Sequence, residues 1–189
     1  MSPTKTAKAE DLDLVRGIFE RIATDLGMII DREIRIFEPQ VGRTRTRVEG
    51  QGQIHISFKL AFKVGEETLH GCLLVPLPDA LGMAAYLMMV PDEAVEASRG
   101  ETELDRSTKD AMLEVGNFVA GAVDAVVRGR FADGCSARSE GCQGVRPGVR
   151  PSFVYEEGRE LIVGRSTAQL HEFPEFELIL MLPIIPPAA

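Results

Sequence analysis

A row of polar residues in the second half of the chain is the feature of this sequence best suited to chemistry. Asp110, Glu114, Asn117 and Gly121 are spaced by fours and threes, and Asp124 follows them. On a helix, where successive residues turn by roughly 100°, this spacing gathers them into one stripe about 80° wide. The stripe presents carboxylates and an amide, which are groups that pair with cations and form hydrogen bonds.

The composition around this stripe indicates that it meets another surface. Asn117 is the only asparagine in the chain, and an asparagine inside a helix is unfavourable because its amide competes with the backbone for hydrogen bonds. Gly116 and Gly121 each cost about 1 kcal/mol relative to alanine. Close approach of another surface would account for these costs. Two simpler interpretations stay open, since the stripe could be a solvated face and the glycines could serve packing between helices.

The helices expected to position the stripe follow from apolar periodicity. The pattern predicts one helix from Glu10 to Gly27, another opening at Pro78, and a long one from Leu104 to Val127. The segment 91–103 is acidic and is expected to be a loop. The core side of the long helix is predicted to consist of Met112, Val115, Val119, Val123 and Val126.

Alternating apolar residues predict an antiparallel sheet. Every even position in 54–64 is apolar, which predicts a strand with one buried face and one wet face, returning through a turn at 65–67 into Leu69–Val75. Because Phe176–Ile184 is apolar on both faces, we expect a central strand there, or an edge covered by a partner. Further strands are predicted at Ile34–Phe37, Phe153–Tyr155 and Glu160–Gly164.

Length and composition indicate one globular α+β domain. The chain has 189 residues, of which 44 % are hydrophobic and 26 % are charged, and its formal net charge is −8. This acidic balance argues against nucleic-acid binding. No apolar run approaches the roughly 20 residues of a membrane span. An odd count of three cysteines favours a reducing, cytoplasmic setting.

The composition also suggests where the domain begins and ends. We expect a flexible leader at 1–9, a single domain at 10–185 and a tail at 186–189. Within the domain, 129–150 is rich in glycine, arginine and serine, and is expected to be an irregular loop with room for a short strand near Cys135 to Ala137.

Two strings in the sequence resemble one known family. Asp110-x-x-x-Glu114-x-x-Asn117, within the local string EVGNFVAG, resembles the signature of the CheC/CheX/FliY chemotaxis phosphatases. The string HGCLLVPLPDALGMAAYLM is similar to the family's glycine-led strand and the helix after it. The resemblance covers about 10–185 and implies an antiparallel sheet with two or three helices packed on it. Two-site members carry a second motif on the first helix, where this chain has Glu20 but Ala23 in place of the asparagine. It is therefore most similar to the single-site CheX type, which forms homodimers.

This resemblance implies an aspartyl-phosphate phosphatase of two-component signalling, acting on a phosphorylated CheY-like receiver. Glu114 and Asn117 would be the catalytic residues, the amide orienting the attacking water and the carboxylate pairing with a lysine of the receiver. Asp110 and Gly121 would bind the partner. No metal or cofactor is expected on this chain, because the Mg²⁺ would belong to the receiver. The alternative is a non-catalytic CheX-like binding or dimerisation module in the same kind of pathway.

Other chemistries are less well supported by the sequence. The three cysteines and three histidines show no CxxC or HExxH spacing, so we expect free thiols and no metal site. The string Arg43-Thr-Arg-Thr-Arg47 has the RxxxR spacing of cyclic-dinucleotide-binding PilZ domains, but their companion (D/N)xSxxG string is missing. We therefore expect a solvated basic strand or loop that faces an acidic partner. No Walker A, GxGxxG or Gly-x-Ser-x-Gly motif occurs.

Overall fold

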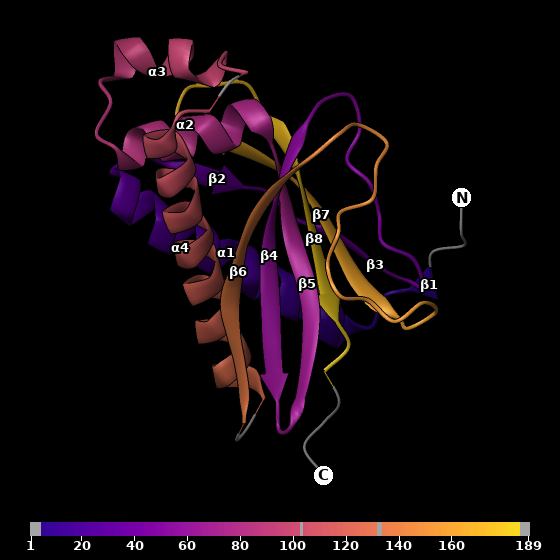
Figure 1. Ribbon diagram of the computed structural model, residues 1–189. Helices are drawn as coiled ribbons and strands as arrows, with labels where there is room; N and C mark the ends of the chain where they lie inside the picture. The colour runs from indigo at the N-terminus through magenta and orange to yellow at the C-terminus, as the bar shows by residue number, and fades with distance from the viewer. Residues whose placement is uncertain (1–4, 103, 132–133, 186–189) are drawn as a thin grey trace.

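An antiparallel sheet forms the framework of the molecule (Figure 1). The computed structural model describes residues 5–102, 104–131 and 134–185. Over these residues the sheet has eight strands in the order β1-β3-β7-β8-β5-β4-β6, and β2 pairs with β7 beside this path. The strands are β1 (Lys5–Thr6), β2 (Ile34–Ile36), β3 (Gln40–Thr44), β4 (His55–Val64), β5 (Glu67–Pro76), β6 (Cys135–Val145), β7 (Leu161–Leu170) and β8 (Phe176–Pro183). The predicted α+β class with an antiparallel sheet is confirmed.

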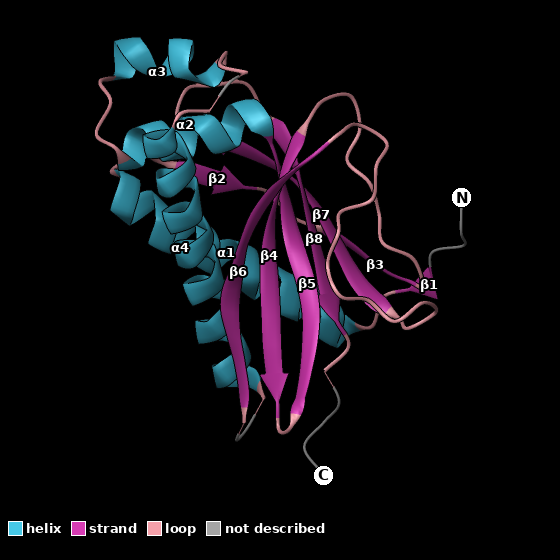
Figure 2. Cartoon of the chain, in the orientation of Figure 1, coloured by secondary structure: helices cyan, strands magenta, loops and turns pink. Residues whose placement is uncertain are grey.

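Four helices accompany the sheet in the described part of the chain, where two or three were expected (Figure 2). They are α1 (Ala9–Ile30), α2 (Leu77–Leu87), α3 (Asp92–Arg99) and α4 (Arg106–Arg130). Buried residues of α1, α2 and α4 share one apolar core with the sheet. The additional helix is α3, in the segment expected to be a loop. Only Val95 of α3 is buried, but Arg99 fixes its end to α2 through an ion pair with the buried Asp79, 2.9 Å away.

The hairpin of β4 and β5 confirms the predicted alternation on the helix side of the sheet. The two strands pair in one register from His55 opposite Pro76 to Val64 opposite Glu67. Side chains at the even positions of β4, including Phe58 and Leu60, are buried in the core shared with the helices. Period-two alternation therefore predicted this face correctly.

The sequence predicted that the opposite face of β4 is exposed to solvent. The structure corrects this prediction, because part of that face is buried. His55 and Ser57 are only 3 % and 0 % exposed. Two long connections cross this outer face, one from β3 to β4 (45–54) and one from β6 to β7 (146–160), and they meet where Gly148 N donates to Gly50 O at 3.2 Å. A second, smaller core lies beneath them, made of Cys72, Leu74, Phe153, Leu161, Val163, Ile179 and Met181.

Two sequence predictions are corrected in these regions. Segment 129–150 is not an irregular loop: α4 continues to Arg130 and β6 occupies Cys135–Val145, paired with β4 along most of its length. Its small and polar composition reflects its place at one edge of the sheet, where much of the strand is solvated. The predicted strand Phe153–Tyr155 is instead part of the β6–β7 connection, with Phe153 buried in the outer core.

Strand β8 lies between β7 and β5, so its two apolar faces belong to a central strand, as expected. The proposed leader is in part structured, because Lys5 and Thr6 pair with Arg43 and Gly42 of β3. Residues 1–4 of that leader and the expected tail at 186–189 lie outside the described residues. Within the described ranges, no helix is long and apolar enough to cross a membrane.

Candidate functional site

Helix α4 carries the predicted site, and a side-chain cap fixes its start. Asp105 accepts a hydrogen bond from the backbone N of Thr108 at 2.7 Å, an interaction that satisfies one of the free donors at a helix N-terminus. This backbone hydrogen bond lowers the pKa of the Asp105 carboxyl below its usual value. The helix accordingly begins at Arg106, slightly later than the predicted Leu104.

The apolar side of α4 is buried as predicted. Met112, Val115, Val119 and Val123 are each at most 1 % exposed, and Val126 is half-buried. This side packs against β6, α1 and α2 (Figure 1). Because the buried side is fixed in this way, the polar stripe on the other side faces solvent.

Glu114 and Asn117 lie next to each other on the exposed side of α4. Both residues are exposed, and Nδ2 of Asn117 donates to Oε2 of Glu114 at 3.3 Å. This distance exceeds the usual 2.7–3.2 Å of an N–H···O hydrogen bond, so the interaction is weak and easily replaced. One helical turn thus presents a hydrogen-bonding amide together with a carboxylate able to receive a cation.

The two expected partner-binding residues extend the same exposed surface. Oδ2 of Asp110 lies 3.8 Å from Nε of Arg106, and both side chains are largely exposed, so this ion pair contributes little. Gly121 is exposed as well, and a Cβ built there would meet nothing within 4 Å. The four predicted site residues therefore share one open face that spans about three helical turns.

Two small residues of α4, Gly116 and Ala120, are buried and do not belong to this open face. Gly116 is buried, and a Cβ there would lie 3.1 Å from Cδ1 of Phe58 and 3.5 Å from Oγ of Ser139. Ala120 is 3 % exposed. Gly116 therefore allows α4 to pack closely on the sheet. The sequence analysis had left open that the glycines serve packing between helices; at Gly116 the packing partner is the sheet.

Asp124 also leaves the stripe, because the structure gives it a structural task. Its Oδ1 accepts a hydrogen bond from the backbone N of Ala137 at 2.7 Å, and its Oδ2 accepts one from Nε of Arg128 at 2.7 Å. Ala137 lies in β6, the strand at the sheet edge beside α4. Asp124 thus ties α4 to that strand, and the spacing that placed it in the stripe could not reveal this contact.

Leu113 is a surface residue that sequence reasoning missed. Its side chain is 42 % exposed beside Glu114, and its Cδ2 lies 3.7 Å from the position a Cβ would take at Gly141. Gly141 belongs to an irregularity of β6 opposite β4, where the register shifts between Phe58 and Leu60. The sequence could have revealed Leu113, because it is an apolar residue directly before Glu114. Its exposed side chain adds an apolar surface at the rim of the stripe.

The stripe is not hollowed into a small-molecule site. Neither Glu114 nor Asn117 lines any of the three principal cavities in the described part of the chain. Among the described residues, no group of three or more histidine, cysteine, aspartate or glutamate side chains is placed to hold a metal ion.

Comparison with known proteins places this arrangement in a structural context. No family model matches the sequence, and no curated protein does. Solved structures do match, and the three named here are each covered over more than 90 % of their own chains. FliY from Thermotoga maritima has a TM-score of 0.68 at 14 % identity, over 95 % of this chain and 92 % of that chain. The middle domain of FliM from H. pylori has a TM-score of 0.62 at 12 % identity, over 95 % of both chains.

A CheX chemotaxis protein from Desulfovibrio desulfuricans also matches, with a TM-score of 0.54 at 12 % identity over 89 % of this chain and 97 % of that chain. This chain has the CheC/CheX/FliY-like fold. At such low identity the likeness establishes the fold alone, so the function rests on the residues of α4.

Helix α1 carries the partial second motif of the sequence, Glu20 with Ala23 in place of an asparagine. Glu20 is exposed there, and Ala23 is half-buried at the edge of a shallow cavity near the end of α1. Since alanine offers no side-chain amide, α1 of this CheC/CheX/FliY-like chain cannot present a second pair equivalent to Glu114 and Asn117.

Proposed function

We propose that this protein is a phosphatase that removes the phosphoryl group from the aspartate of a CheY-like receiver domain. The observation that carries the proposal is the exposed pair of Glu114 and Asn117 on the open face of α4. The similarity in fold to CheX and FliY supports it.

The chemistry suits the residues available. An acyl phosphate is reactive, so a catalyst gains most by holding a water molecule in line with the phosphorus atom. The Asn117 amide would orient this water, and the reaction would break the bond between phosphorus and the aspartyl oxygen, releasing inorganic phosphate. The Mg²⁺ that neutralises phosphoryl charge would be bound by the receiver.

Glu114 would fix the docking position. Its carboxylate would exchange the weak 3.3 Å hydrogen bond from Asn117 for a lysine of the receiver, which would free the amide for the water. Asp110 would add a contact at the rim, and Gly121 would allow close approach. The exposed surface fits this division of labour, because the receiver would supply the cleft that holds the phosphoryl group.

The direct test is the lifetime of a phosphorylated CheY-like receiver with and without this protein. We expect substoichiometric protein to shorten the lifetime, and Asn117→Ala to lower turnover by about 10²-fold because the water is no longer positioned. Glu114→Ala should weaken receiver binding. Glu20→Ala on α1 is the matched control, since it removes an exposed carboxylate away from the site, and it should leave turnover unchanged. An Asn117→Ala protein as active as the wild type would refute the assignment.

A second candidate is a binding module that docks on a signalling or motor protein without hydrolysis. It is favoured by the structure of the FliM protein from H. pylori in complex with FliG, which has a TM-score of 0.61 to this chain. In that case the receiver would bind and its lifetime would not change.

We further propose that the protein forms a homodimer, as the CheX-like sequence features imply. Strand β6 ends the sheet on one side and offers backbone groups for pairing. Light scattering at micromolar concentration should give twice the chain mass of 20.7 kDa. A clean monomer would contradict this proposal and leave the phosphatase proposal standing.

A further inference from the structure

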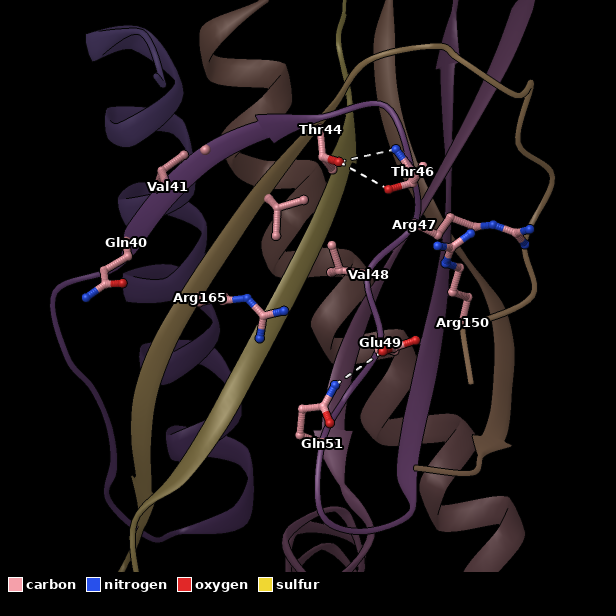
Figure 3. Close-up of a pocket in the computed structure, with 12 residues that line it drawn as sticks. Gln40, Val41, Thr44, Thr46, Arg47, Val48, Glu49, Gln51, Arg150 and Arg165 are labelled. Atoms are coloured by element: carbon pink, nitrogen blue, oxygen red, sulfur yellow. Dashed lines mark hydrogen bonds between the residues drawn. The ribbon is translucent and has the colours of Figure 1, made fainter. Parts of the chain in front are cut away.

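A second candidate site lies on the face of the sheet that the helices leave free. A cavity of about 610 Å³ opens there over β3 and β7, under the connection 45–54 (Figure 3). Its floor includes Val163, a member of the outer core, whereas the neighbouring Gly164 faces Val15 of α1 on the other side of the sheet. The cavity and the stripe on α4 therefore lie on opposite sides of the sheet.

The cavity is positively charged in an otherwise acidic protein. Arg47, Arg150 and Arg165 line it, and Glu49 is the one acidic residue in its lining. The whole chain carries a formal charge of −8. Arg165 forms an ion pair with Glu177 at 2.9 Å, and Glu177 lies outside the lining. No ion pair joins Glu49 to any of the three arginines in the described structure, so the charges of Arg47 and Arg150 are not neutralised from within the cavity.

Most hydrogen-bond donors of these arginines are unused. Each guanidinium carries five N–H donors in a fixed fork. Among the described residues, Arg47 donates to the carbonyl of Pro151 at 3.0 Å, and Arg165 donates to Glu177 at 2.9 Å. The side chain of Arg150 makes no hydrogen bond or ion pair with any described residue. The remaining donors are available to a ligand.

Arg47 is held in place before any ligand arrives. Its guanidinium carbon lies 5.8 Å from the ring centre of Phe153 and 5.6 Å from that of Tyr155, which are cation–π distances. Its bond to Pro151, the residue after Arg150, brings two like charges to the same wall of the cavity. Arg165 stands on the facing side (Figure 3). An anion beside Arg47 and Arg150 would relieve this repulsion, and it would meet one guanidinium, that of Arg47, already held in position.

The rest of the lining sets the kind of ligand. Thr44 and Thr46 add hydroxyl groups, while Val48 and Val163 add an apolar surface. The volume falls within the 300–1,000 Å³ typical of small-molecule sites. Arginine forks match the oxygens of phosphate groups, and an uncharged portion of the ligand would cover the valines. The RxxxR spacing does not itself build this site, because Arg43 is paired with the buried Asp11 at 2.7 Å.

We propose that this cavity binds a phosphorylated small molecule of nucleotide size. Its phosphate groups take the free donors of Arg150, Arg47 and Arg165, and its uncharged part lies over the apolar floor. The site is independent of the α4 stripe and of the proposed phosphatase activity.

The test is calorimetric titration of the protein with ADP, pyrophosphate and citrate. We expect ADP to bind with a Kd below about 1 mM, and more tightly than pyrophosphate because it also covers the valines. Citrate, which carries carboxylates in place of phosphates, should bind most weakly. The proposal is overturned if none of the three binds in this range, or if pyrophosphate or citrate binds as tightly as ADP.

Variants separate a built site from general electrostatic attraction. Arg150→Gln and Arg165→Gln should each weaken ADP binding by at least about tenfold, through loss of charge-assisted hydrogen bonds. Arg146→Gln is the matched control, because it removes the same charge four residues before Arg150, from a side chain that does not line the cavity. Equal weakening by Arg146→Gln and Arg150→Gln would refute the site.

A second readout locates the ligand in the fold. In NMR spectra, saturating ADP should shift the backbone amides of 44–48 and leave those of 114–117 in place. Shifts confined to α4 would contradict the proposal, even if calorimetry detects binding.

Discussion

Gly121→Ala is expected to raise stability and lower phosphatase activity at the same time. Gly121 lies inside α4, where alanine is favoured over glycine by about 0.5–1 kcal/mol. A Cβ there meets nothing within 4 Å, so no clash offsets this gain. For a chain of this size, 1 kcal/mol corresponds to a rise in Tm of about 2–4 °C.

The same methyl group should obstruct the receiver. If the partner backbone packs closely over Gly121, inserting a methyl group into that contact costs about 1–3 kcal/mol, by analogy with overpacked cores. This corresponds to about 5- to 150-fold weaker binding. The effect should appear as a raised KM for the phosphorylated receiver, measured from its rate of dephosphorylation over a range of receiver concentrations.

Gly116→Ala is the matched control, since it makes the same chemical change on the same helix but on the buried side. Its Cβ would lie 3.1 Å from Phe58, so the clash offsets the helical gain and Tm should not rise. The reasoning fails if Gly121→Ala lowers Tm, because the position would then not be open. It also fails if Gly121→Ala leaves KM unchanged, because Gly121 would then lie outside the docking surface.

Three further predictions concern stability and reactivity. Burial is the largest single effect on Asp11 and opposes its ionisation, but the hydrogen bonds from Arg43 and from the backbone of Lys8, together with their positive charges, lower the pKa of Asp11 below its usual value. The ionised carboxylate of Asp11 therefore stabilises the fold fully at a pH above 3.8, its pKa in the unfolded chain. This stabilisation is lost as the pH falls through the lower pKa of the folded state. Asp11→Asn should cost about 3 kcal/mol at pH 7 in urea unfolding and much less at pH 2; an equal loss at both pH values would contradict this. Asp124→Ala should cost about 1–3 kcal/mol and speed hydrogen exchange at the Ala137 amide, which loses its acceptor, and unchanged exchange would contradict the tie. Burial raises the pKa of Cys72 to about 12, so a thiol reagent at pH 8 should label it only after denaturation, and rapid labelling of the native protein would contradict its burial.

Local periodicity predicted those elements whose environment is uniform along their length. The apolar face of α4 and the face of β4 that meets the helices are both buried in one continuous core. The apolar repeat in the sequence therefore matches the burial in the fold. Strand β8 was placed as central for the same reason, because both of its faces are apolar and both are covered. The open stripe with Glu114 and Asn117 followed directly from the helical spacing.

Periodicity was misleading where burial depends on segments distant in sequence. His55 and Ser57 are polar but buried, because the connections 45–54 and 146–160 cross the outer face above the strands. Strand β6 looked like a loop because an edge strand is partly solvated and needs few large apolar residues. Its pairing with β4, about 80 residues away in the chain, supplies the order that its composition does not suggest.

The sequence by itself determined the α+β class, the amphipathic helix and the chemical character of its exposed stripe, because these depend on neighbours within one or two helical turns or along one strand. Only the tertiary structure decided which polar and small residues belong to the stripe. It directed Asp124 to the edge strand and Gly116 to Phe58, and it left Gly121 open. It also brought Arg47, Arg150 and Arg165 to one cavity from three separate segments. The physical reason is that hydrogen bonds and van der Waals contacts act over a few ångströms of space, whatever the separation along the chain.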